Sequence, residues 1–344
     1  FGSAGSTPID TRPVRPPWMP GFPLASPGWQ SSSTPLCDTS AGTYSGLGVW
    51  ADQRGVFALA AHSCALDSEG FVTDCGQSGL SLQFNPGTGW QNAFSVWPDS
   101  DGRGFAVSQL TGFPGGSVLA VDALIQGQAG IFAIDQGTAT AQATGADAPS
   151  QVFVVDATTA YGVSGTHVLR YEAGTWVKFA DVPSEMYSVW ADTNRVVVAG
   201  TQVYQSPTAA AGFTQVPNAP VGSYWGVWGF GSNEIWISAG DQLAEYDGNQ
   251  WNLVDASSLG ATGAMWGMNG VLFFSAGGGL GRISSGQLDV SIPATGAGYL
   301  TVTGVWGRSL TEVFVSMNDE HGQHTYACGG DFMVWFDGAQ FHQF

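Results

Sequence analysis

The stretch WGVWGFGSNEIWISAG at residues 225–240 decides the fold class, because degenerate copies of it recur along the chain. Related stretches begin at residues 46, 94, 187, 263 and 303, and each carries a tryptophan in a short apolar run. These marker tryptophans are Trp50, Trp97, Trp190, Trp228, Trp266 and Trp306. The gaps between them are 47, 93, 38, 38 and 40 residues, and the long gap contains a seventh copy with Val155 in the tryptophan position. Seven units of roughly forty residues, built from strands and turns, predict a seven-bladed β-propeller.

The fifth unit shows how one blade should be built. Apolar runs at 226–228, 234–238, 242–246 and 250–254 predict four strands, and Asp247-Gly248 predicts the hairpin turn before the last strand. Glycine accepts the positive φ that such a turn requires. Small four-stranded antiparallel sheets bury both faces when they pack side by side around an axis. The chain shows no sustained 3.6-residue apolar period, so we expect an all-β protein with almost no helix.

Residues 1–43 differ in composition from residues 44–344, which contain all seven units. Eight of the seventeen prolines fall in this first segment, and a proline-rich chain favours the extended polyproline conformation. The segment also carries five large apolar side chains, which are Phe1, Trp18, Met19, Phe22 and Trp29. We expect a tail that docks either on its own propeller or on a neighbouring subunit or partner, where it would help to build an extracellular assembly. Disorder throughout the segment is the alternative.

Charge restricts the partners of this chain. Nine Lys and Arg residues stand against twenty-seven Asp and Glu residues, which gives a formal net charge of −18 at pH 7. Nucleic acids and anionic membrane surfaces would repel such a protein, so neither is an expected partner. No apolar run reaches eighteen residues, so we expect no membrane insertion. The chain begins with Phe1 rather than Met, which indicates either removal of a leader or a trimmed sequence.

Four cysteines predict two disulfides. Cys64 and Cys75 bracket an insertion in the first unit, so they are the expected hairpin pair. Cys37 precedes the first unit and Cys328 lies in the last, and these two units are neighbours in a closed ring, so a bridge between them would secure the seam. Zinc binding is the alternative use, but the chain has no CxxC spacing. Two disulfides would place the protein in an oxidising compartment, either secreted or at the cell surface.

Long insertions indicate where a binding face should lie. We expect them between the second and third strands of units 1, 2 and 7, at residues 63–79, 110–128 and 318–330, all on one face of the ring. The candidate binding residues in or beside them are His62, Asp67, Glu69, Asp74, Asp319, Glu320, His321 and His324. His321 and His324 form a weak candidate metal pair because no third ligand is suitably spaced, and a solvated acidic loop is the favoured interpretation. No cofactor is predicted.

The elements VWGxSxxEVFV at 305–315 and YDGxxW at 246–251 resemble a family of secreted bacterial propeller repeats, associated with large-genome environmental bacteria such as myxobacteria. The resemblance covers residues 44–344 and is strongest in units 5 and 7. It implies the propeller fold and a secreted protein. The family has no settled activity and supplies no catalytic residues, so the function stays open.

Three functions remain after these arguments. The first is an extracellular, non-enzymatic binding or structural protein that packs against itself or another extracellular protein, which suits a chain with 10% charged residues. The second is a carbohydrate-binding propeller in which Trp90, Trp176 and Trp251 stack on sugars, although packing between blades is the favoured interpretation of these side chains. The third is an enzyme with its site at the axial mouth of the loop-bearing face, although no Gly-x-Ser-x-Gly motif or nucleophile–histidine spacing supports it.

Overall fold

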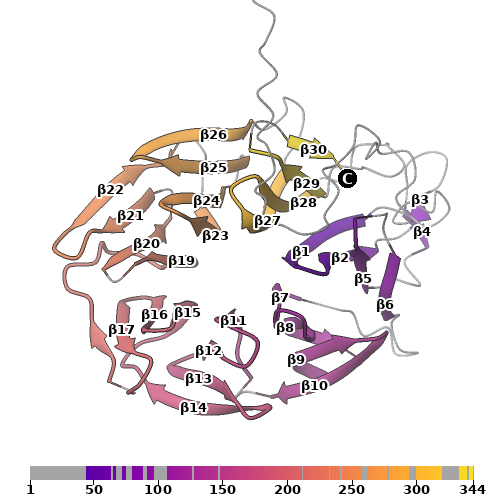
Figure 1. The fold of residues 1–344 in the computed structure, drawn as a ribbon, viewed down its shortest axis with the longest axis horizontal. Helices are drawn as coiled ribbons and strands as arrows, with labels where there is room; N and C mark the ends of the chain where they lie inside the picture. The colour runs from indigo at the N-terminus through magenta and orange to yellow at the C-terminus, as the bar shows by residue number, and fades with distance from the viewer. Residues whose placement is uncertain are drawn as a thin grey trace, which may run out of the picture.

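The computed structural model describes residues 44–62, 65–66, 72–74, 80–87, 91–96, 107–125, 128–145, 148–210, 212–231, 233–240, 242–257, 262–276, 279–293, 300–319, 333–338 and 341–343. These residues form seven four-stranded antiparallel sheets around a central axis, together with a separate two-stranded sheet (Figure 1). No α-helix occurs in the part of the chain that is described. The predicted all-β, seven-bladed propeller is confirmed.

Each blade is one continuous stretch of chain, with its first strand nearest the axis and its fourth outermost (Figure 1). Blade 1 contains β1 (Tyr44–Asp52), β2 (Gly55–His62), β5 (Leu80–Asn85) and β6 (Gln91–Val96). Blade 2 contains β7 (Gln109–Gly112), β8 (Val118–Ile125), β9 (Gln128–Asp135) and β10 (Thr138–Thr144). Blade 3 contains β11 (Gln151–Val154), β12 (Ala160–Ser164), β13 (His167–Glu172) and β14 (Thr175–Asp181). Blade 4 contains β15 (Met186–Ala191), β16 (Arg195–Gly200), β17 (Val203–Pro207) and β18 (Thr214–Gln215).

The remaining blades follow the same plan. Blade 5 contains β19 (Val227–Phe230), β20 (Glu234–Ala239), β21 (Gln242–Tyr246) and β22 (Trp251–Asp255), which confirms the four strands predicted for this unit. Blade 6 contains β23 (Thr262–Met268), β24 (Val271–Ala276), β25 (Gly279–Ser284) and β26 (Gln287–Pro293). Blade 7 contains β27 (Leu300–Ser309), β28 (Glu312–Asp319), β29 (Met333–Phe336) and β30 (Phe341–Gln343).

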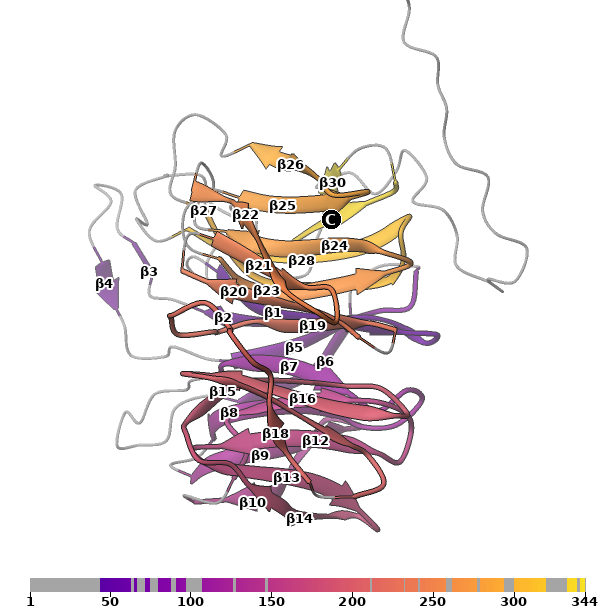
Figure 2. The same ribbon diagram turned by 90° about the vertical axis from the view of Figure 1, so that its left-hand side faces the viewer.

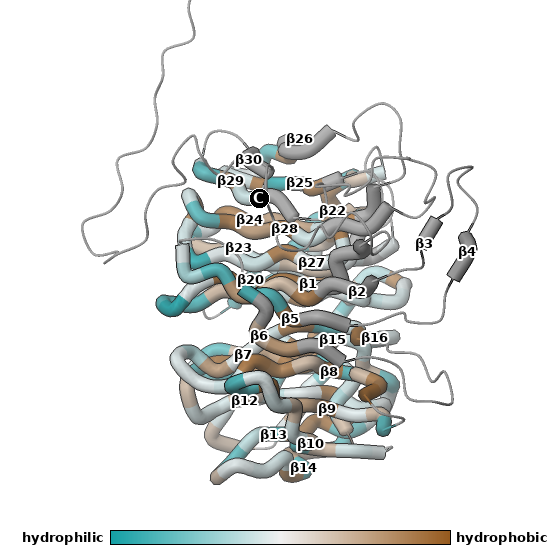
Figure 3. The backbone as a smooth tube through the Cα atoms, turned by 90° about the vertical axis from the view of Figure 1, so that its right-hand side faces the viewer, coloured by the Kyte–Doolittle hydropathy of each residue, from teal (hydrophilic) through white to brown (hydrophobic). Residues whose placement is uncertain are grey.

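The hydrophobic core lies between blades, over their inner and middle strands. All six residues of β16 are buried, whereas none of the seven residues of the outer strand β14 is. A middle strand is covered on both faces by neighbouring blades, so it reads as a continuous apolar run rather than an alternating one. Figure 3 shows this distribution as brown, hydrophobic segments on strands such as β8 and β24.

The marker tryptophans pack each inner strand onto the next blade. A Cβ added to Gly229 would lie 2.5 Å from the ring of Trp190, and one added to Gly307 would lie 2.5 Å from the ring of Trp266. Each of these glycines follows the marker tryptophan of its own blade. The sequence Trp-Gly therefore repeats because one residue fills the space between blades while the next accepts the preceding blade's ring without a side chain of its own.

The structure corrects the predicted second unit. Phe94 lies in β6, the outer strand of blade 1, and the inner strand of blade 2 is β7 instead. Thr111 takes the marker position, because it pairs with Leu119 and the following Gly112 lies under the ring of Trp50. The prediction was wrong because half-buried inner and outer strands share the same two-residue apolar alternation. Trp97 itself lies outside the described residues.

Two further predictions change with this register. Phe153, not Val155, holds the marker position of blade 3, because it pairs with Tyr161 just as Trp50 pairs with Phe57. Val155 follows β11 and donates its backbone N–H to Thr159. The predicted insertion at residues 110–128 is also wrong, since this range contains most of β7 and the whole of β8.

The other two insertions are where the sequence predicted them. In blade 1 the chain between β2 and β5 contains the two-stranded sheet of β3 (Ala65–Leu66) and β4 (Val72–Asp74). This sheet projects beyond one face of the ring (Figure 2). In blade 7 the corresponding connection runs from β28 to β29. Blades 1 and 7 are neighbours, because the indole N–H of Trp306 donates to the backbone oxygen of Ala51 at 3.0 Å.

Candidate functional site: the mouth of the central cavity

The seven inner strands enclose a cavity of about 390 Å³ on the propeller axis. Residues from all seven blades line it, so it belongs to the ring rather than to any single blade. Its size lies within the range of small-ligand pockets. All inner strands begin at the same face, and the residues that line the mouth there stand three positions before the marker in their blades. They are Ser108, Ser150, Tyr187, Trp225, Gly263 and Thr303.

One wall of the mouth is aromatic. Tyr187 and Trp225, from neighbouring blades, stack with ring centroids 4.5 Å apart and planes inclined by 14°. Trp225 has 59% of its surface exposed, whereas Trp228, three residues later, is buried. An indole face open to solvent beside a cavity is a stacking platform for a planar or apolar ligand group.

Glu185 accepts a hydrogen bond from the tyrosine of this aromatic wall. The Tyr187 hydroxyl donates to Glu185 Oε2 at 3.1 Å. This hydrogen bond to a carboxylate raises the pKa of the Tyr187 phenol above its ordinary value, so the phenol stays protonated at neutral pH. Tyr187 therefore offers a neutral aromatic ring to a ligand and not a base.

The adjoining wall is polar and comes from blades 2 and 3, next to blade 4 in the ring. Ser108 Oγ donates to Asp122 Oδ2 at 2.7 Å. The Gln109 amide donates to the backbone oxygen of Val152 at 2.8 Å and accepts from its N–H at 2.9 Å. Gln151 Oε1 accepts the N–H of Val189 at 2.7 Å. These glutamines hold neighbouring inner strands together, so the polar wall is rigid.

In other blades, glycines stand at the position that these glutamines hold in blades 2 and 3. The position equivalent to Gln109 is a glycine in blades 1, 5 and 7, where it is Gly48, Gly226 and Gly304. A Cβ at Gly226 would lie 2.1 Å from the backbone oxygen of Gly263, so the inner strands of blades 5 and 6 approach too closely for a side chain. The cavity is thus asymmetric: amide side chains separate blades 2 to 4, and bare backbone packs at blades 5 and 6.

Marker side chains form the inner end of the cavity. Phe153, Trp228 and Trp306 line it at the level farthest along the inner strands from the mouth. Phe153 meets Trp228 edge-on at 5.6 Å, although blade 4 lies between their blades. Trp228 Nε1 is buried without a hydrogen-bond partner among the described residues. The site therefore has an apolar inner end, one aromatic wall and one polar wall.

Most of the loop residues predicted as a binding face lie outside the described residues. His62, Asp74 and Asp319 lie at the last positions of β2, β4 and β28. Asp67, Glu69, Glu320, His321 and His324 lie outside the described residues, as do all four cysteines and the tail side chains Phe1, Trp18, Met19, Phe22 and Trp29. Within the described ranges, no three His, Cys, Asp or Glu side chains come close enough to hold a metal ion. The same ranges contain no helix long and apolar enough to cross a membrane.

The tryptophans proposed as sugar platforms are occupied by packing. Trp251 is half-buried against Tyr246, and its indole N–H donates to the backbone oxygen of Pro217 at 3.0 Å. Trp176 is half-buried against Tyr171 at 5.4 Å. Both lie on outer strands, as the packing interpretation predicted, and Trp90 lies outside the described residues.

Sequence reasoning missed Trp225 and Tyr187, although a signal was present. The runs YSVW at 187–190 and WGVW at 225–228 place an aromatic residue three positions before the marker in two successive units. A marker fills the space between blades, but the residue three positions earlier lies at the beginning of the strand, at the mouth. Two aromatic residues at this position in neighbouring units predict a stacked pair there.

Comparison with known proteins identifies the fold and no family. No protein-family model matches the chain, and no curated protein matches its sequence. Among solved structures, YCF48 bound to D1 peptide gives a TM-score of 0.55 at 11% identity, covering 82% of this chain and 92% of that one. A catalytically inactive virginiamycin B lyase from Staphylococcus aureus with quinupristin gives 0.53 at 11% identity, covering 82% and 93%. The WD40 propeller domain of Doa1 gives 0.53 at 11% identity, covering 89% and 97%. These structures share the propeller fold with this chain.

Proposed function

We propose that this protein is an extracellular, non-enzymatic binding propeller that takes a protruding group of a protein partner into its central cavity. The exposed stack of Trp225 on Tyr187 at the cavity mouth carries this proposal. Interfaces concentrate their binding energy in aromatic side chains that fill or line a pocket, surrounded by residues that exclude water. No other described feature combines a cavity, an exposed aromatic platform and fixed polar groups.

The chemistry of the walls supports binding rather than catalysis. Asp122 is the one carboxylate among the described lining residues, and the Tyr187 phenol is held neutral. The described lining therefore lacks the pair of carboxylates with different pKa values that is typical of acid–base sites. The amides of Gln109 and Gln151 are engaged with backbone, which suits a rigid recognition surface.

An extracellular setting is supported by composition. Four cysteines that can form two bridges, scarce charge and the resemblance to secreted propeller repeats all favour it. Two solved propellers of the same fold contain a peptide or quinupristin, so a rigid propeller serves well as a ligand-presenting scaffold.

Carbohydrate is the second candidate ligand. An exposed indole face beside serine hydroxyls and an aspartate is also the composition of a sugar-binding site, in which the apolar face of the ring stacks and the hydroxyls bond to polar groups. The relevant platform is Trp225 at the mouth, not the outer-strand tryptophans. A glycan array distinguishes this candidate from a peptide ligand.

The proposal is tested by selecting a displayed peptide library against the protein. The affinity of each enriched peptide is then measured for the wild type and for the variant Trp225→Ala. Enriched peptides should bind with micromolar affinity and lose at least tenfold on Trp225→Ala, because hot-spot aromatic truncations cost about 2 kcal/mol or more. Leu253→Ala is the matched control: Leu253 is 58% exposed but lies on the outer strand β22, away from the axis.

Two outcomes would contradict the proposal. One is an enrichment that survives Trp225→Ala and Tyr187→Ala unchanged, which would place recognition elsewhere. The other is a set of glycan-array signals that require Trp225 while no peptide does, which would favour the carbohydrate candidate. Circular dichroism of each variant checks that the blades remain folded.

A further inference from the structure

The walls of the central cavity select the charge of the group that enters it. Asp122 is the one charged residue among the described lining residues, and no Lys, Arg or His lies among them. The faces of Tyr187 and Trp225 add a second attraction, because an aromatic face carries the negative part of the ring's quadrupole. A cation is therefore favoured over an anion at this mouth. The net charge of −18 also draws cations from a distance.

Asp122 is held with one carboxylate oxygen left for a ligand. Ser108 donates to Oδ2, and no described residue donates to Oδ1. Asp122 lies in a β-bulge of β8, between Ala120 and Ala123, and has a φ of 48°. A bulge redirects a side chain relative to the sheet, and this left-handed backbone is uncommon outside glycine. The strand is thus deformed at the residue that supplies the cavity's charge.

The aromatic wall suits a planar cation better than a compact one. A guanidinium group stacks flat on an indole while its edge N–H groups reach a carboxylate, whereas an ammonium group has no flat face. Glu185 strengthens this wall, because a phenol that donates to a carboxylate becomes more electron-rich. The preferred ligand group is therefore an arginine side chain.

The chain itself contains arginines that could supply this side chain. Five of the six described cations, Arg54, Lys178, Arg170, Arg195 and Arg308, each bond to a nearby carboxylate or backbone oxygen. The sixth, Arg282, lies in the third strand β25 and does not line the cavity. Two of the remaining arginines, Arg12 and Arg15, stand in the sequence TRPVRPP at residues 11–17. Prolines beside both arginines favour an extended backbone, which presents a side chain at low entropic cost.

We propose, building on the binding function above, that the central cavity binds an arginine of the segment TRPVRPP at residues 11–17 of the same chain. The tether makes this geometry accessible. Strand β1 begins at Tyr44 on the mouth face, and its residues Gly48 and Val49 line the cavity. The 29 residues from Arg15 to Tyr44 span up to roughly 95 Å at about 3.3 Å per residue. A tethered ligand is present at an effective concentration of about millimolar, so the segment competes with external partners.

The test is a competition measured by fluorescence anisotropy. A labelled peptide of residues 8–20 is titrated against the full-length protein and against the full-length double variant Arg12→Gln/Arg15→Gln. The double variant should bind the peptide at least tenfold more tightly, because its own segment no longer occupies the cavity. Replacing both peptide arginines by citrulline, a neutral isostere, should weaken binding at least tenfold.

Site variants in the double-variant background locate the binding. Asp122→Asn and Trp225→Ala should each weaken peptide binding at least tenfold. Asp135→Asn removes the same charge at the end of β9, where third strands reach the face opposite the mouth, and should change affinity by less than about twofold. Raising the salt concentration should weaken binding of the arginine peptide more than that of the citrulline peptide.

Four results would overturn the inference. Equal binding of the arginine and citrulline peptides would remove the charge argument. Equal peptide binding by the wild type and the double variant would show that the chain's own segment does not occupy the cavity. Association that grows with protein concentration and requires Arg12 and Arg15 would mean that the segment binds the cavity of a second copy of the protein. If library peptides still require Trp225 while the residue 8–20 peptide does not bind, the proposed function stands and this inference fails.

Discussion

At the residue scale, the ring depends on glycine or alanine after the marker in every blade except blade 3. The rings of Trp190 and Trp266 occupy the space above Gly229 and Gly307, where a Cβ would lie 2.5 Å from an aromatic carbon. The markers Trp50 and Trp266 are almost fully buried. The tryptophan and the following glycine thus act as one unit, which is repeated in blades 5, 6 and 7.

Substituting alanine for Gly229 should lower the free energy of unfolding by about 1–3 kcal/mol, because the new methyl group forces the Trp190 ring from its position. Chemical denaturation measures the loss. Gly212→Ala is the control, since nothing lies within 4 Å of a Cβ there, and it should stay within about 0.5 kcal/mol of the wild type. Equal effects at both positions would contradict the packing argument.

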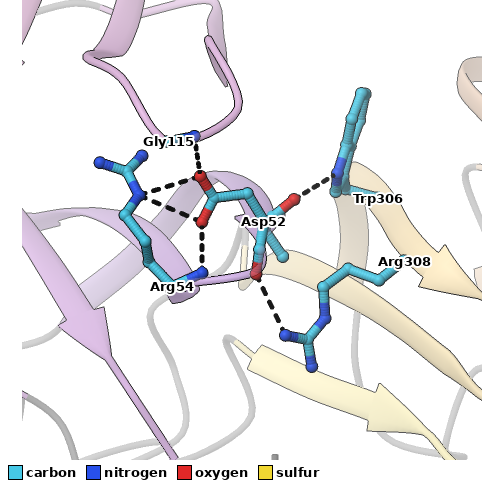
Figure 4. Close-up of polar contacts among 6 residues, drawn as sticks. Asp52, Arg54, Gly115, Trp306 and Arg308 are labelled. Atoms are coloured by element: carbon cyan, nitrogen blue, oxygen red, sulfur yellow. Dashed lines mark hydrogen bonds and ion pairs between the residues drawn. The ribbon is translucent and has the colours of Figure 1, made fainter. Parts of the chain in front are cut away.

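At the element scale, the ring closes without sharing a strand between its ends. Blade 7 consists of residues from 300 to 343 and blade 1 begins with β1, so side chains must join them. Arg308 Nη1 donates to the backbone oxygen of Asp52 at 3.1 Å, as Trp306 does to that of Ala51. The Asp52 carboxylate accepts from Arg54 at 2.9 Å and from the N–H of Gly115 in blade 2 at 2.7 Å (Figure 4). This buried aspartate therefore connects blades 7, 1 and 2.

Asp52→Ala should lower the free energy of unfolding by about 2–3 kcal/mol, because it leaves a half-buried guanidinium and the backbone N–H of Gly115 without their acceptor. Asp192 is the matched control. It stands at the same position after its marker, but it accepts from the N–H groups of Asn194 and Arg195 in its own turn. Asp192→Ala should cost about 1 kcal/mol. Hydrogen exchange should increase at the blade 7–blade 1–blade 2 junction for Asp52→Ala, and a uniform increase around the ring would contradict the assigned role.

At the scale of the whole molecule, stability depends on keeping one seam closed. Each blade is a separate sheet, so no strand pairing joins blade 7 to blade 1.

The described pair Ala65 and Asp74 stands opposite across β3 and β4, and Cys64 and Cys75 are their neighbours in the sequence. This register favours the predicted hairpin pairing.

Peptide mapping without reduction should find Cys64 linked to Cys75 and Cys37 linked to Cys328. A bridge between Cys37 and Cys328 would close a loop of nearly three hundred residues, and the chain-entropy model assigns it on the order of 5–6 kcal/mol. Reduction should therefore lower the melting temperature and raise hydrogen exchange first at blades 7 and 1. A peptide that links Cys37 to Cys64 would disprove the predicted pairing.

Local periodicity made the fold class readable. The repeated Trp-Gly unit and the Asp247-Gly248 hairpin are short-range patterns, and they predicted the blade number, the absence of helix and the strands of blade 5. The same patterns misplaced the inner strand of blade 2, because an outer strand alternates just as an inner strand does. In blade 3 they found the inner strand but set its marker two residues too late, at Val155 instead of Phe153. The pairing of a strand with its partner, such as Thr111 with Leu119, shows whether that strand is inner or outer.

The sequence by itself determined a propeller of seven blades, since each forty-residue unit encodes its own sheet through local turns and alternation. The tertiary structure decided where a ligand can bind. Trp225 and Tyr187 are 38 residues apart, and Ser108 and Asp122 come from a third part of the chain. Closure of the ring brings them around one cavity, because inner strands that all start at the same face converge on the axis. A site assembled from such distant residues has no local signature, so it appears when the blades are placed relative to one another.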